Sequence, residues 1–145
     1  MSIIKEIYDV AKDGAALKNK ASGIKKALRT ELKLNRKCLL DIEEGINLEN
    51  DRRIEIIKML DIQELSAAVK YEIPYSTISR KMVTREIATE FKVKRIEGTN
   101  IEKLIEDLYL LISYLKKDYR NKRISLNLRL INIYKYNRVL IELLK

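Results

Sequence analysis

The sequence contains no histidine and no tryptophan, a single cysteine, a single proline and only four glycines in 145 residues. The absence of histidine excludes every mechanism that needs an imidazole from this chain, and every metal site with histidine ligands. A single cysteine excludes an intrachain disulfide. The scarcity of glycine and proline, together with 46% hydrophobic residues, argues against collagen-like and low-complexity chains. The sequence therefore predicts a folded, helix-rich protein.

Long hydrophobic runs are also missing. The longest near-continuous apolar run, residues 108–115, is interrupted by Ser113 and is far shorter than the roughly 18 residues that a membrane span needs. Lys5 and Glu6 put a positive and a negative charge into the stretch that would be apolar in a signal peptide. We therefore expect no membrane partner and a cytoplasmic location, the usual one for a chain with one cysteine and no export signal.

The charges are abundant but unevenly distributed. Lys and Arg number 30 against 21 Asp and Glu, a formal net charge of +9. Residues 18–37 contain eight bases and one acid, and residues 116–138 again contain eight bases and one acid, so each segment carries +7. Residues 41–64 contain eight acids and three bases, a net charge of −5. Such a distribution predicts a molecule with separate basic and acidic regions rather than a uniformly basic one.

Apolar residues recur every three or four positions through most of the chain, which predicts helices. We expect them at 3–11, 22–46, 50–60, 61–69, 75–89, 100–118 and 122–144, with 50–60 and 61–69 open to being one broken helix. Expected N-caps are Ser22, Asn50, Asp61 and Thr99, and Gly45 is an expected helix end. In residues 91–96 apolar and polar side chains alternate weakly, which is typical of an extended segment.

Residues 124–130 alternate with the period of a strand, but no comparable partner strand occurs elsewhere in the sequence, so we expect a helix there. The predicted fold is a single all-α domain, residues 1–145, forming a compact bundle of five to seven helices. Its core is expected to consist of the helices at 22–46, 100–118 and 122–144.

Two basic surfaces are predicted. One is a stripe on the helix at 22–46, where bases step by three or four residues: Lys26, Arg29, Lys33, Arg36 and Lys37. The other lies in the C-terminal basic segment: Lys116, Lys117, Arg120 and Arg123. Each surface is either a solvated face or an anion-binding face. Four tyrosines lie within this second segment or just before it, where an aromatic ring can stack on nucleic acid, line a protein interface or simply pack: Tyr114, Tyr119, Tyr134 and Tyr136.

Residues 64–82 resemble a helix-turn-helix DNA-binding motif. Ala68 is the small residue that lets two helices approach, while Ile73 and Ile78 match the apolar residues that lock the turn. The resemblance implies that the second helix lies in the major groove, so that five side chains face DNA: Tyr75, Ser76, Thr77, Ser79 and Arg80. The alternative is an ordinary helical hairpin with no contact to DNA.

A broader resemblance covers residues 31–145. The chain here looks like small bacterial all-helical proteins of uncharacterised function. The resemblance is carried by residues 99–105, then Tyr109, Leu115 and Lys116, and finally an Arg-x-x-Asn-Ile pattern at 129–133. That resemblance implies a helical fold and no activity.

No residue pattern predicts catalysis. Cys38 lies beside Leu39 and Leu40 and lacks a histidine partner, so we expect a buried structural thiol. We expect no enzyme activity, no cofactor and no metal. The leading hypothesis is a non-catalytic module that binds nucleic acid, DNA rather than RNA, through its basic helices. The alternative is an adaptor or interaction subunit with no nucleic-acid role. It would meet an acidic protein partner, or use an apolar face or the acidic segment 41–64 to meet a partner or a second copy of itself.

Overall fold

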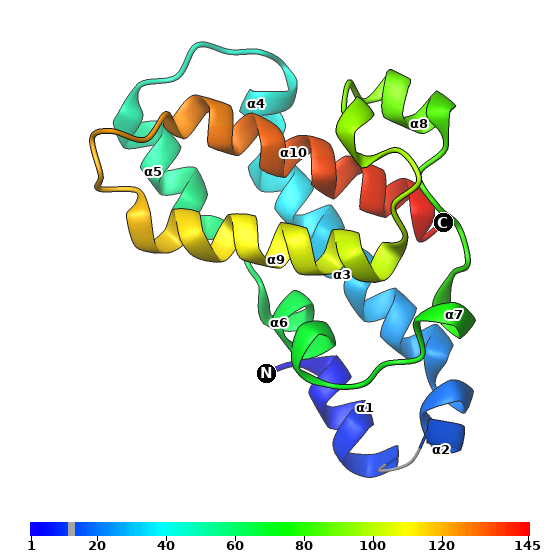
Figure 1. The fold of residues 1–145 in the computed structure, drawn as a ribbon. Helices are drawn as coiled ribbons and strands as arrows, with labels where there is room; N and C mark the ends of the chain where they lie inside the picture. The colour runs from blue at the N-terminus through cyan, green and yellow to red at the C-terminus, as the bar shows by residue number, and fades with distance from the viewer. Residues whose placement is uncertain (12–13) are drawn as a thin grey trace.

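The computed structural model describes residues 1–11 and 14–145, and within them it contains helices and no strand (Figure 1). The all-α fold class is therefore confirmed, but short helices raise the number of helices above the expected five to seven. The helices are α1 (Ile3–Ala11), α2 (Gly14–Asn19), α3 (Ala21–Cys38), α4 (Leu40–Glu43), α5 (Asn50–Met59), α6 (Gln63–Lys70), α7 (Tyr75–Ile78), α8 (Arg85–Glu90), the 3-10 turn η1 (Lys94–Ile96), α9 (Ile101–Asp118) and α10 (Leu126–Leu143).

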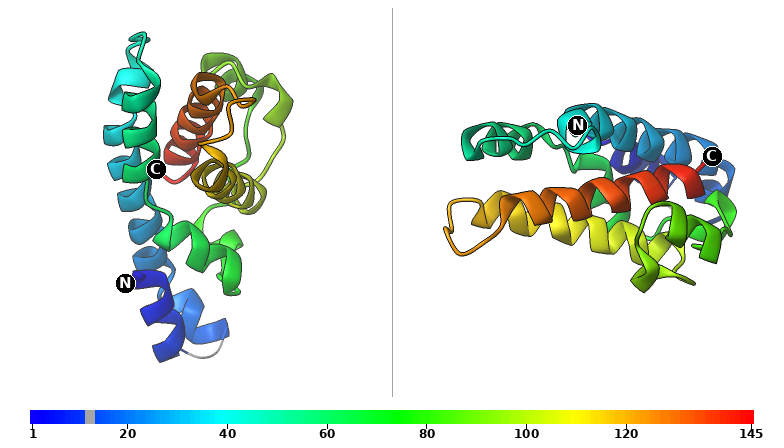
Figure 2. Two further views of the ribbon diagram at one scale, coloured as in Figure 1. Left: turned by 90° about the vertical axis from the view of Figure 1, so that its left-hand side faces the viewer. Right: turned by 90° about the horizontal axis from the view of Figure 1, so that it is seen from above.

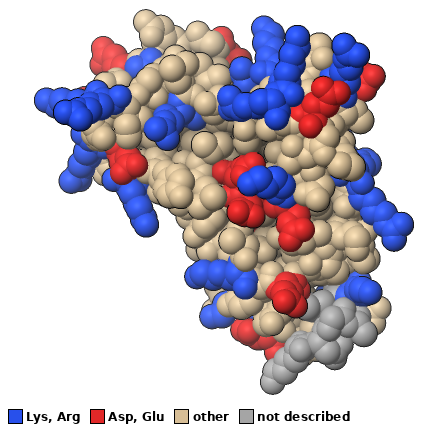
Figure 3. Space-filling view, in the orientation of Figure 1, with Lys and Arg blue, Asp and Glu red and all other residues tan. Residues whose placement is uncertain are grey.

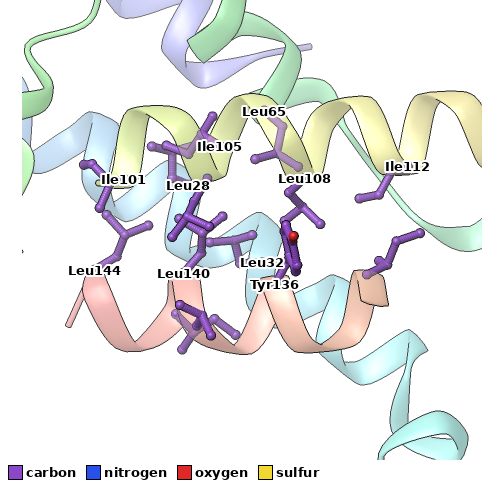
Figure 4. Close-up of a cluster of buried hydrophobic side chains, with 14 of the residues drawn as sticks. Leu28, Leu32, Leu65, Ile101, Ile105, Leu108, Ile112, Tyr136, Leu140 and Leu144 are labelled. Atoms are coloured by element: carbon purple, nitrogen blue, oxygen red, sulfur yellow. The ribbon is translucent and has the colours of Figure 1, made fainter. Parts of the chain in front are cut away.

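The core consists of the three long helices that the apolar period predicts. Figure 2 shows α10 between α3 and α9. Leu32 on α3, Leu108 on α9 and Leu140 on α10 are each fully buried, and Figure 4 shows these side chains meeting between the helices. Burying a leucine side chain contributes about 1.5–3 kcal/mol. This three-helix core fixes the positions of the surface features described below.

The predicted helix at 22–46 is wrong in its extent. It begins one residue earlier, and α3 ends at Cys38 because Leu39, which is fully buried, leaves the helical path with φ −95° and ψ 11°. The Leu39 N–H donates to the carbonyls of Asn35 and Arg36, and α4 then adds a single turn. Gly45 follows with φ +70°, a left-handed conformation that glycine adopts without steric cost.

The predicted helix at 75–89 is also interrupted. α7 is a single turn, and Ser79 already has the extended angles φ −164° and ψ 135°. Val83 then exchanges backbone hydrogen bonds with the segment before α9, donating to Thr99 O at 2.9 Å and accepting from Gly98 N at 2.8 Å. Because this pairing requires extended backbone, the helix cannot continue, and α8 restarts with Thr84 as its N-cap.

Several smaller expectations are corrected as well. Residues 91–96 are not extended: Lys92 has φ 56° and the 3-10 turn η1 follows. Ser22 and Asn50 lie inside their helices, and α9 is capped by Asn100 rather than Thr99. The helices at 50–60 and 61–69 are separate, as α5 and α6. The period of two at 124–130 does not produce a strand, since α10 begins at Leu126.

Three buried polar side chains hold α6 and its neighbours. Glu31 of α3 accepts hydrogen bonds from the backbone N–H groups of Glu64 and Leu65, at 2.9 and 2.8 Å, at the start of α6. The Glu64 carboxylate accepts from Ser2 Oγ and from the N–H groups of Ile3 and Ile4 at the start of α1. Each carboxylate thus satisfies helix N–H groups that have no intrahelical partner.

Asn35 forms the third link, to the backbone just before α6. Its amide N donates to Asp61 O at 2.7 Å and its amide O accepts from Asp61 N at 2.9 Å. This reciprocal pair fixes the α5–α6 connection against α3. None of these three contacts follows from a local sequence pattern, because each joins residues far apart in the chain.

Glu31 makes stability depend on pH. Burial raises its pKa from 4.5 to about 7 despite the two backbone hydrogen bonds. Between these values the folded state binds more protons than the unfolded state, so this contribution is complete below pH 4.5 and is lost as pH rises through 7. We expect urea denaturation at pH 5 and pH 8 to show a loss of at most about 3 kcal/mol from this group. Glu31→Gln should flatten that dependence, and an unchanged profile in Glu31→Gln would contradict the assignment.

Within the described residues, no helix is both long enough and apolar enough to cross a membrane. The same part of the chain holds no group of three or more His, Cys, Asp or Glu side chains arranged to bind a metal ion. Cys38 is a free thiol, and it is half-buried rather than fully buried as we expected.

Candidate nucleic-acid interface

The C-terminal basic segment meets α5 at one end of the helical core. Lys116, near the end of α9, donates through Nζ to Ile57 O at 2.9 Å, and so closes the end of α5. Burial lowers the pKa of Lys116 below its ordinary value, although Asp61 opposes the shift. Because Lys116 contacts the backbone of Ile57 and Lys58, it holds Lys58 close to the segment that connects α9 to α10.

Tyr119 lies at the centre of this region. Its ring is half-buried, with Lys58 Nζ at 6.0 Å and the Arg120 guanidinium carbon at 5.6 Å from the ring centroid. Such distances are typical of cation–π contacts. The two cations therefore lie against an aromatic ring that is still partly open to solvent.

The remaining cations of the connection extend into solvent. Lys117, Arg120, Lys122 and Arg123 are all exposed. Among the ion pairs of the described residues, none involves these four side chains. Figure 3 shows blue side chains gathered over the α9–α10 connection, at the left of the view. We call this surface the basic end: Lys58, Lys116, Lys117, Tyr119, Arg120, Lys122 and Arg123.

The predicted stripe on α3 is present, but only part of it is exposed. Lys26, Lys33 and Lys37 are exposed, whereas Arg29 and Arg36 are half-buried. The buried side of α3 packs against α10, and the three exposed lysines of the stripe are not among its buried residues. The stripe thus lies on a different helix from the basic end.

Two arginines of the basic segments are engaged by a single carboxylate. Glu43 Oε1 lies 2.9 Å from Arg36 Nη2 and 2.6 Å from Arg138 Nη1, and it accepts the Tyr134 hydroxyl at 3.0 Å. Burial acts to raise the pKa of Glu43, but the hydrogen bonds from Arg36 and Tyr134 outweigh it and leave the pKa below the ordinary value. Arg36, predicted as part of the basic surface, thus holds α3 to α4.

The five side chains predicted to face DNA are divided between interior contacts and solvent. The Tyr75 hydroxyl donates to Ala68 O at 2.8 Å, and Ser79 Oγ donates to Leu143 O at 2.9 Å. Ser76, Thr77 and Arg80 are exposed. Because α7 has only four residues, the segment lacks the longer second helix that the helix-turn-helix resemblance implies.

Two carboxylates lie near Tyr75 at the start of α7, whereas Lys18 and Lys25 lie beside Thr77 and Ile78. Burial, followed by the charges of Glu102 and Glu106, raises the pKa of Tyr75 to about 12. Carboxylates close to a phosphate-facing surface repel the nucleic-acid backbone. These carboxylates disfavour a phosphate beside Tyr75, one of the five residues predicted to face DNA.

Sequence reasoning identified the cations and Tyr119 of the basic end but missed Lys58, which belongs to the net-acidic segment 41–64. No local signal marks Lys58, since its place depends on the packing of α5 against α9.

Comparison with known proteins finds no matching family, no matching curated protein and no matching solved structure. The two resemblances stated from the sequence therefore stay predictions.

Proposed function

We propose that this chain is a non-catalytic, cytoplasmic module that binds nucleic acid through the basic end, with DNA as the expected ligand. The observation that carries the proposal is the group of exposed cations without carboxylate partners around the half-open ring of Tyr119. Cations of this kind bind phosphates and release counterions, and an aromatic ring among them stacks on an unpaired base.

The arrangement favours single-stranded nucleic acid over sequence-specific reading of a duplex. Phosphate contacts carry no sequence information by themselves, and the one-turn α7 offers no long helix for the major groove. The α3 stripe adds long-range attraction, because its three exposed lysines, on a different helix, raise the positive potential of the molecule.

The test is a salt titration of binding to a fluorescent single-stranded DNA, an RNA of the same sequence and the corresponding duplex, followed by anisotropy. We expect binding to the single strand with a log–log slope of about −3, as four or five phosphate contacts give. A slope near zero, or no binding at low salt, would contradict the proposal and leave the adaptor hypothesis. Equal affinity for the RNA would contradict only the preference for DNA.

Tyr119→Leu should separate stacking from charge. Leucine keeps an apolar side chain against the core but removes the aromatic face, so affinity for the single strand should fall by about 1–3 kcal/mol. The salt slope and the affinity for the duplex should change little, since no cation is lost. Tyr119→Phe is the matched control and should bind like the wild type. Equal losses on both ligands would show that Tyr119 only supports the local structure.

A further inference from the structure

A groove lies between the end of α6 and the first turns of α9, away from the basic end. Its volume is about 410 Å³, and it is lined by residues 68–73, Tyr75, Glu102 and Glu106. A second hollow of about 310 Å³ shares Tyr75 and Glu102 with it and continues toward residues 79–82. We call the first hollow the acidic groove; Figure 3 shows red side chains near the centre of this face of the molecule.

The acidic groove carries net negative charge, although Lys103 on α9 interacts with Glu106. Three exposed carboxylates, those of Glu72, Glu102 and Glu106, line it together with a single cation, Lys70. No ion pair of the described residues involves these carboxylates, whereas Asp107 next to them binds Lys103 Nζ at 2.9 Å.

The end of α6 adds to this negative potential. The helix ends at Lys70, so its last carbonyl groups have no intrahelical donor and form the negative end of the helix dipole. One of them, Ala68 O, accepts the Tyr75 hydroxyl. Val69 and Lys70, the last two residues of α6, line the same groove as the three carboxylates.

The walls of the acidic groove are partly apolar. Val69 is 41% exposed, and Tyr71, Ile73 and Tyr75 also line the groove. Apolar walls beside carboxylates suit a side chain with a methylene stem and a cationic head, which describes lysine and arginine. A volume of about 410 Å³ lies at the lower end of the range of ligand pockets in proteins.

We propose that the acidic groove docks an extended, lysine- or arginine-bearing segment of a partner protein. The cationic heads pair with Glu72, Glu102 and Glu106, and the stems lie on the apolar wall. The second hollow is lined by Arg80 and Lys81 and lies outside the proposed site. We choose this occupant because the groove is negatively charged and such a segment is positively charged. Because the acidic groove repels phosphates and the basic end attracts them, the two surfaces take different partners.

The test uses the full chain, treated with nuclease, and a fluorescein-labelled peptide of alternating lysine and alanine, measured by anisotropy at low salt. We expect saturable binding that the double change Glu102→Gln, Glu106→Gln weakens by about tenfold or more. The matched control is Glu86→Gln, Glu90→Gln, which removes two exposed carboxylates from α8. This control should bind like the wild type, and circular dichroism should show both variants folded.

Four results would overturn the proposal. The first is the absence of saturable binding to the wild type, and the second is equal weakening in the groove variant and the α8 control. The third is equal binding of a peptide whose lysines are acetylated, since that peptide keeps the stems and lacks the charges. Displacement of the peptide by spermidine at an affinity equal to its own would also overturn it, by assigning the groove to small polyamines. None of these results bears on the basic end.

Discussion

Reversing Lys117, Arg120 and Arg123 to glutamate should lower the affinity for single-stranded nucleic acid by about 100-fold or more at low salt. Each change removes one cation–phosphate contact and introduces a repulsion, so the magnitude of the salt slope should fall by about two. All three residues are exposed and have no ion pair in the described part of the chain. Unfolding free energy should therefore change by only about 0.5 kcal/mol per site.

The matched control for this variant is the reversal of Lys26, Lys33 and Lys37 on the α3 stripe. It changes the net charge by the same amount and also alters exposed residues without ion pairs. We expect it to weaken binding by no more than about tenfold, through the loss of long-range attraction alone. A larger loss from the control than from the basic-end variant would assign the nucleic-acid contact to α3 and contradict our placement of the interface.

Glu31→Ala should have the largest effect on stability. The change leaves the N–H groups of Glu64 and Leu65 without their acceptors in a buried place, and it opens a cavity between α3 and α6. We expect the free energy of unfolding to fall by about 2–4 kcal/mol. Urea denaturation followed by circular dichroism measures this loss.

Glu31→Gln is the control for that prediction, because the amide oxygen still accepts one of the two hydrogen bonds. Its cost should be about 1 kcal/mol or less at neutral pH, where the wild-type carboxyl is itself partly ionised in a buried site. If Glu31→Ala were as stable as the wild type, the link between α3 and α6 would not hold the fold together as described.

The three-helix core is predictable from the sequence because each long helix carries its own apolar period. Leu28 and Leu32 of α3, and Leu104 and Leu108 of α9, follow steps of three or four that position them on one face, and all four are fully buried. Helix periodicity is a local property, so local reasoning reaches it.

The helix interruptions are not predictable in this way. Residues 79–84 have an adequate apolar pattern for a helix, yet Val83 pairs with the backbone of Gly98 and Thr99. The stabilisation from these hydrogen bonds depends on where α9 begins. The residues around position 83 contain no information about that distant start. The same limit applies to Glu31 and Asn35, whose partners lie 26 or more residues away.

The candidate interface is predictable in part. Charge counting located the cations around Tyr119, but it also gave equal weight to Arg36 and Arg138, which Glu43 engages. The helix-turn-helix resemblance rests on residue types at fixed spacing, and it could not foresee that Glu102 and Glu106 would lie beside α7. Tertiary packing thus decides which charges are available to a ligand.

The most direct test of the central claim is lysine footprinting, in which the protein is acetylated with and without saturating single-stranded DNA and the modified sites are quantified by mass spectrometry. Our account predicts that bound DNA protects Lys58, Lys117 and Lys122 of the basic end, while Lys70 beside the acidic groove stays as reactive as in the free protein. Protection of Lys81, next to Arg80, without protection of the basic end would contradict the account and restore residues 75–80 as the DNA-binding surface.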